Sequence, residues 1–128
     1  MRYYFKKLLN VDFDAAVARV TQALKDEGFG IITEIDVTET LKNKIGVEFR
    51  PYRILGACNP GLAYEALKLE DKVGTMLPCN VVVQELAPGQ VEVAAIDPVK
   101  SMAAIDNSAL LAEAQIVGDR LEKVIRSL

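Results

Sequence analysis

The segment from Cys79 to Ile96 constrains the fold more than any other part of the chain. Cys79 to Leu86 is a strand-like run with three consecutive valines at its centre, and Val91 to Ile96 is a second such run. The residues between them, Ala87-Pro88-Gly89-Gln90, are typical of a tight turn. A connection this short joins antiparallel neighbours, because a parallel pair needs a long crossover. The segment therefore predicts a β-hairpin within an antiparallel sheet.

The rest of the chain alternates between strand and helix patterns. We expect further strands at 2–9, 30–36 and 52–57, from their alternating or β-rich composition. Apolar residues at helical spacing predict helices at 13–26, 37–45, 60–69 and 107–128, with a turn of helix in 99–105 and a polar connection over 68–75. These elements predict a single domain, residues 1–128, with an α+β fold: a two-layer sandwich of a mainly antiparallel sheet, arranged β-α-β4-α, with long helices on one face.

Apolar residues point to both faces of the central strands. Val81, Val82 and Val83 cannot all lie on one face, because side chains alternate along a strand. A sheet covered by helices on one side only should alternate apolar with polar residues. We therefore expect both faces to be covered, the second by short helices, by a ligand or by a second copy of the chain. A symmetric homodimer is the commonest such solution.

The only two cysteines of the chain lie in two similar turns. Cys58 is in Gly56-Ala57-Cys58-Asn59-Pro60, and Cys79 is in Pro78-Cys79-Asn80. If strands 52–57 and 79–86 are antiparallel neighbours, both cysteines lie at the same edge of the sheet. Asn59 is a good N-cap and Pro60 suits the first position of the following helix. Amide groups at that N-terminus favour a thiolate at Cys58.

Three uses of this cysteine patch remain open. Cys58 and Cys79 could bind a soft metal ion or a small ligand, or they could serve a thiol-based redox protein or enzyme. Alternatively, they are small buried hydrophobes in a structural or interaction homodimer without chemistry. The spacing matches no known metal or redox signature, and two thiolates are too few for structural zinc unless a dimer supplies two more.

An anion could also bind at the N-terminus of helix 60–69, with Arg50 or Arg53 nearby. The simpler interpretation, which we prefer, is that these arginines are solvated surface residues. The candidate ligand-binding residues are Cys58, Asn59, Pro60, Cys79, Asn80 and Arg53. The cofactor stays open.

Several of these blocks together resemble the domain of unknown function 302 family. The resemblance rests on residues 52–60, Ala63, Ala66-Leu67, residues 77–83, Asp97-Pro98 and Met102. It covers nearly the whole chain and implies a compact α+β fold similar to the TATA-binding-protein-like arrangement, with a strand and a helix leading into a four-stranded antiparallel sheet and a last helix. It also implies a small homodimer, but no activity, and the fold does not bring DNA binding with it.

Composition excludes some classes of function. The chain has no histidine, which rules out Ser–His and Cys–His catalytic couples and imidazole metal ligands within one chain. Its net charge is −3 without a basic block, so we expect no nucleic-acid partner. No apolar run is long enough for a membrane span and the N-terminus does not resemble a signal peptide. We expect a soluble, cytoplasmic domain with reduced cysteines, of which the most favoured function is small-ligand or soft-metal binding near the two turns.

Overall fold

The computed structural model describes residues 2–128 and consists of one antiparallel sheet with helices. The strands are β1 (Tyr4–Leu9), β2 (Gly30–Asp36), β3 (Tyr52–Cys58), β4 (Cys79–Ala87) and β5 (Gln90–Ile96). The helices are α1 (Phe13–Asp26), α2 (Val37–Ile45), α3 (Pro60–Leu69), the 3-10 helix η1 (Asp71–Met76), α4 (Pro98–Ser101) and α5 (Ser108–Ser127). The α+β class is confirmed.

The five strands follow the spatial order β1-β5-β4-β3-β2, and every neighbouring pair is antiparallel. The β4–β5 hairpin predicted from the Pro88-Gly89 turn is present, and Gly89 takes the left-handed conformation at φ 74°. β3 pairs with β4, which is the neighbour relation expected for the two strands that carry the cysteines.

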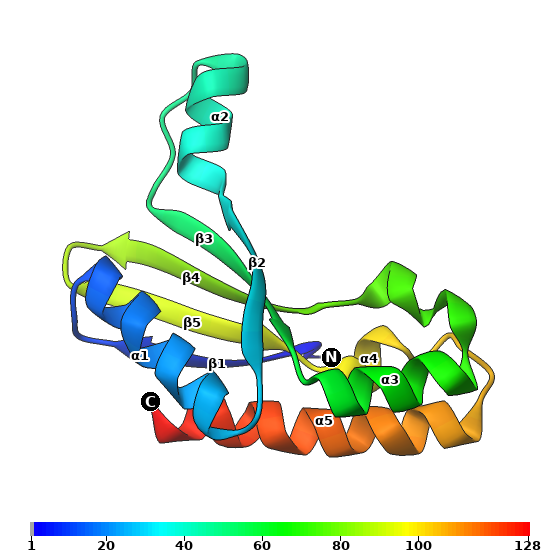
Figure 1. Ribbon diagram of the computed structural model, residues 1–128. Coiled ribbons are helices and arrows are strands. Elements are labelled where there is room, and N and C mark those ends of the chain that lie inside the picture. Colours follow the sequence, from blue (N-terminus) through cyan, green and yellow to red (C-terminus); the bar gives the residue numbers. More distant parts are fainter. Residues whose placement is uncertain (1) are drawn as a thin grey trace.

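The main core lies between one face of the sheet and the two long helices α1 and α5 (Figure 1). Alternate residues of the central strands point into it, among them Leu55, Val81, Val83 and Val93, all fully buried. The helices contribute a stripe at helical spacing that includes Val20, Leu24, Leu121 and Val124. Helix α1 begins where the Asp12 side chain accepts a hydrogen bond from the Ala15 amide at 2.7 Å.

A second, smaller hydrophobic cluster lies beyond the end of the sheet. There α3, η1 and α4 pack beside the first half of α5 (Figure 1). Its buried members are Ala66, Val73, Met102, Leu110 and Ala114. The segment 68–75 was expected to be only a polar connection, and this was wrong for η1: Val73, its single large apolar residue before Met76, is fully buried and anchors the turn.

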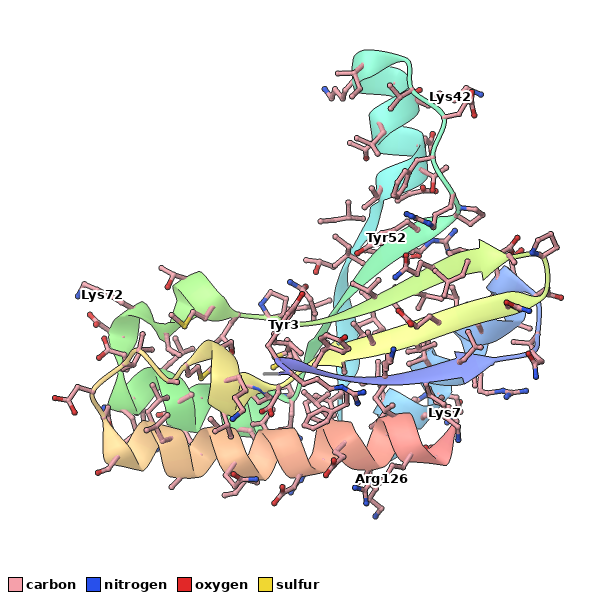
Figure 2. All side chains as sticks on the ribbon, turned by 180° about the vertical axis from the view of Figure 1, so that it is seen from behind. Tyr3, Lys7, Lys42, Tyr52, Lys72 and Arg126 are labelled. Carbon is pink, nitrogen blue, oxygen red and sulfur yellow. The ribbon has the colours of Figure 1, made fainter. Side chains whose placement is uncertain are left out.

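Helix α2 stands away from the rest of the molecule on an arm formed by the ends of β2 and β3 (Figure 1). None of its residues is buried. The arm is closed at its base by Thr38, whose hydroxyl accepts from the Tyr52 amide at 2.9 Å and donates to the Arg50 carbonyl at 2.7 Å. Figure 2 shows the Lys42 side chain in solvent at the far end of the arm.

The face of the sheet opposite α1 and α5 carries an apolar row, one residue from each of four strands. The register places Ile35 beside Ile54, Ile54 beside Val82 and Val82 beside Ala94. Ile35 is 48% exposed and the other three are half-buried. We expected both faces to be covered, yet within residues 2–128 the short helices α3 and α4 lie at the end of the sheet and leave this row open.

Candidate functional site

The two cysteine-containing turns meet at one end of the sheet. Ala57 of β3 lies directly opposite Cys79 of β4, so Cys58 is one residue beyond that pair. The register thus brings the two turns to the same end of the sheet, as predicted, but Cys58 and Cys79 themselves do not form a close pair. Ala57 and Cys79 are buried on the helix-covered side, whereas Cys58 belongs by alternation to the other side of the strand.

The turn after Cys58 starts α3 through local capping. The Asn59 side chain accepts a hydrogen bond from the Leu62 amide at 3.1 Å, and Pro60 occupies the first turn. The turn after α1 comes close to this cap, because a Cβ atom on Gly28 would lie 2.9 Å from Asn59 Nδ2. Gly28 also has a φ of 87°, so this close approach favours glycine for two reasons.

A cavity of about 330 Å³ opens beside these turns, between the sheet end and the second cluster. Exposed Ile32 and Leu67 line it and mark the side that faces solvent. Its deeper walls come from the turns and from α3, α4 and α5, and they include Phe29, Ala57, Cys58, Asn59, Leu62, Ala63, Ala66, Leu77, Pro78, Cys79, Pro98, Met102, Leu110, Glu113, Ala114 and Val117. A mostly apolar hollow of this volume with a few polar groups is typical of small-molecule sites.

One carboxylate interrupts the apolar wall. Glu113 of α5 lines the cavity, and its Oε1 atom is buried without a hydrogen-bond partner among the described residues. Buried polar atoms almost always have partners, so an orphaned carboxylate oxygen in a cavity wall indicates a place where a ligand group could donate.

The two thiols differ in environment. Burial, with a smaller contribution from neighbouring Cys58, raises the pKa of the Cys79 thiol to about 11. Cys79 is therefore a neutral thiol at pH 7, and Cys58 is half-buried. Both are free cysteines, and the structure does not join them as a bonded pair. In residues 2–128, no three histidine, cysteine or acidic side chains converge as a metal site would require.

The six predicted site residues divide into three groups. Cys58, Asn59 and Cys79 line the cavity, whereas Pro60 and Asn80 lie beside it without lining it. Arg53 is held elsewhere, at the base of the arm. Its guanidinium pairs with Glu34 at 3.1 Å across β2 and β3 and lies 5.2 Å from the centre of the Phe13 ring.

Arg50 also lies away from the start of α3. It precedes β3 and stacks over the Phe49 ring at 4.4 Å. Neither arginine lines the cavity.

Sequence reasoning missed the α5 side of the site. Glu113 lies three residues after Leu110 and four before Val117, so it sits on the apolar stripe of this helix. A charged residue within such an apolar stripe could have identified Glu113 as a candidate site residue. The contributions of Ala66 and Met102 could not be found in this way, because they depend on how distant helices pack.

Together, the antiparallel sheet, its two covering helices and the apolar cavity at its end define a small α+β domain with a candidate ligand site. The family model described as "Domain of unknown function DUF302" matches residues 5–128, and the chain belongs to this family. The resemblance seen in the sequence is thereby confirmed.

The chain is also similar to a solved structure, described as the crystal structure of uncharacterized conserved protein DUF302 from Bacillus stearothermophilus. The two share 28% identity and a TM-score of 0.90 over 98% of each chain. No curated protein matches the chain. None of the helices within residues 2–128 combines the length and apolar character that crossing a bilayer requires.

Proposed function

We propose that this domain binds a small, largely apolar organic molecule in the cavity between the cysteine turns and α5. The observation that supports this most is the cavity itself, with a volume of about 330 Å³ and walls that are almost wholly apolar. An engineered apolar cavity of roughly 150 Å³ in another protein holds benzene, so this one has room for a molecule of about a dozen non-hydrogen atoms.

A ligand of this kind suits the site better than a soft metal ion or thiol chemistry does. Two cysteines with no further converging donors in residues 2–128 offer too few ligands for a stable metal site. The raised pKa of Cys79 leaves this thiol protonated at neutral pH, which disfavours attack on an electrophile or a disulfide. In this proposal Cys58 and Cys79 serve as part of the cavity wall.

The proposal is tested by filling the cavity. Ala63 lines it and is half-buried, so Ala63→Phe would place a ring in the space. We expect ¹⁵N–¹H correlation spectra of the wild type to shift at cavity residues on titration with phenyl-bearing probes such as 2-phenylethanol. Ala63→Phe should abolish these shifts, whereas Ala112→Phe, at an exposed position of α5 outside the cavity, should retain them. Saturable shifts in Ala63→Phe equal to those of the wild type would contradict the proposal.

A second candidate function is self-association as a homodimer. It is supported by the open apolar row Ile35–Ile54–Val82–Ala94 and by helix α2, which has no buried residue on its arm. Burial of this row against a second copy would remove apolar surface from water. The two functions are compatible, because the row and the cavity involve different residues.

A further inference from the structure

Glu113 defines the chemistry of the cavity more narrowly than its apolar walls do. The carboxylate is on α5, on the face that carries Leu110 and Val117, and it contributes to the wall together with both of these residues. Its Oε1 atom is buried and receives no hydrogen bond from any group in residues 2–128. Leaving such an atom without a donor is unfavourable, and the penalty is largest for a charged group.

No basic side chain within residues 2–128 forms an ion pair with this carboxylate. Within the described residues 2–128, no lysine or arginine lines the cavity, and none comes within 4.0 Å of Glu113 as an ion pair. Lys68 of α3 pairs with Glu65 at 2.9 Å, and Lys72 of η1 pairs with Asp71 at 3.3 Å. Figure 2 shows the Lys72 side chain projecting outward from the end of the molecule.

The other polar groups of the cavity wall are poorer hydrogen-bond partners for a ligand than Glu113 is. The side-chain oxygen of Asn59 already accepts a hydrogen bond from the Leu62 amide of the α3 cap. Cys79 is a weak donor that stays neutral at pH 7, and the Cys58 thiol is also only a weak hydrogen-bonding group. The cavity thus combines one anionic acceptor with apolar surroundings.

We propose that the ligand is an apolar amine, whose protonated nitrogen donates to the Glu113 carboxylate while its hydrocarbon part fills the cavity. This inference rests on the proposed function and narrows it to one chemical class. A charge-assisted N–H···O bond is shorter and about twice as strong as a neutral one, and it strengthens where water is excluded. A ligand with its own carboxylate is rejected, because two like charges would share a site of low polarity.

Three probes of similar shape test the inference on the wild-type protein. They are 2-phenylethylamine, which is protonated at pH 7, neutral 2-phenylethanol and anionic 3-phenylpropionate. We expect titration calorimetry to give the amine at least about tenfold tighter binding than the alcohol, and the propionate to bind weakest. This comparison needs no variant, so it holds whether or not a substitution at Glu113 folds.

Glu113→Gln then assigns the preference to the carboxylate. In this variant the amine and the alcohol should bind within about twofold of each other, and the affinity for the alcohol should stay near the wild-type value. Glu48→Gln, an exposed position outside the cavity, should keep the wild-type preference.

The outcomes separate the two proposals. If the amine and the alcohol bind equally to the wild type, and Ala63→Phe abolishes both, the cavity is a ligand site but the assignment of an amine is wrong. The same holds if Glu113→Gln keeps the full preference for the amine. If none of the three probes binds, the proposed function fails together with this inference.

Discussion

Cys79 illustrates how a residue chosen for its chemistry can turn out to be governed by packing. It lies in the first position of β4, opposite Ala57, and is buried in the main core. Its position at the sheet end could be predicted, because the tight β4–β5 turn and the strand pattern favour an antiparallel neighbour for β3. Its buried environment could not, because that depends on helices that are distant in the sequence. The same limit applies to Glu113. The burial of its Oε1 atom could not be predicted, because it depends on how α5 packs against the other elements.

The raised pKa of Cys79 predicts a loss of stability at high pH. Its folded-state pKa is about 11, above the ordinary value of 9.0. Below pH 9 the thiol is protonated in both states; between pH 9 and 11 the unfolded chain releases the proton that the native state retains, so unfolding becomes easier. We expect wild type to lose about 2–3 kcal/mol relative to Cys79→Ala over this interval.

The measurement is urea unfolding of both proteins with a reductant at pH 7, 9, 10 and 11. The difference between the two proteins isolates Cys79 from the lysines and tyrosines that titrate in the same range. Cys58→Ala, which retains Cys79, should follow the wild-type pH dependence closely. Parallel curves for wild type and Cys79→Ala would show that the buried thiol does not resist ionisation.

At the scale of elements, local signals determined most boundaries. Asp12, Asn59 and Asn107 each cap a helix, Asn59 as the sequence predicts, and Gly46 ends α2 in the left-handed conformation. The 3-10 helix η1 escaped this reasoning, because its ordering depends on a single buried valine whose neighbours come from α3, α4 and α5. Much of the cavity wall also depends on packing between distant elements. The sequence therefore predicted the two cysteine turns at one side of the cavity but not the shape of the cavity.

Gly56 of β3 shows how closely the strand end is packed. A Cβ atom at this position would lie 1.9 Å from Thr33 Oγ1 and 2.7 Å from the Pro78 ring. We therefore expect Gly56→Ala to lower the free energy of unfolding by about 1–3 kcal/mol, because the ring and the neighbouring strand must move. Chemical unfolding followed by circular dichroism measures this.

Gly30→Ala in the adjacent strand β2 is the matched control. A Cβ atom there has no heavy atom within 4 Å, so this variant should be neutral or slightly stabilised. In a double variant, Thr33→Ala should restore part of the stability lost in Gly56→Ala, since it removes the closest contact. Equal effects of Gly56→Ala and Gly30→Ala would contradict this account of the packing.

At the scale of the whole molecule, the two faces of the sheet have different environments. One is covered by α1 and α5, and the other presents its apolar row beside the projecting arm (Figure 1). The valines of β4 predicted apolar character on both faces, and this is what the register shows. Whether a partner covers the second face could not be predicted from the sequence pattern, because the residues of a partner surface are not part of that pattern.

If a second copy covers this row, a charge placed in it should separate the copies. Ile35→Lys introduces an ammonium group into the row, whereas Ile116→Lys makes the same change at an apolar site on α5. The two isoleucines are similarly exposed, at 48% and 45%. We expect sedimentation velocity to show a wild-type dimer, a monomer for Ile35→Lys and an unchanged dimer for Ile116→Lys. A wild type that is monomeric at all concentrations would exclude the homodimer.

Helix α5 belongs to both hydrophobic clusters: Leu110 and Ala114 lie in the small one, and Leu121 and Val124 in the main one. The cavity lies where the two clusters adjoin, since Ala57 and Cys79 of one and Ala66 and Met102 of the other share its wall. A molecule bound there would contact both the main hydrophobic cluster and the smaller one. Binding would stabilise the packing of the smaller cluster against the sheet. It would therefore raise the free energy of local unfolding of that cluster while the sheet stays folded.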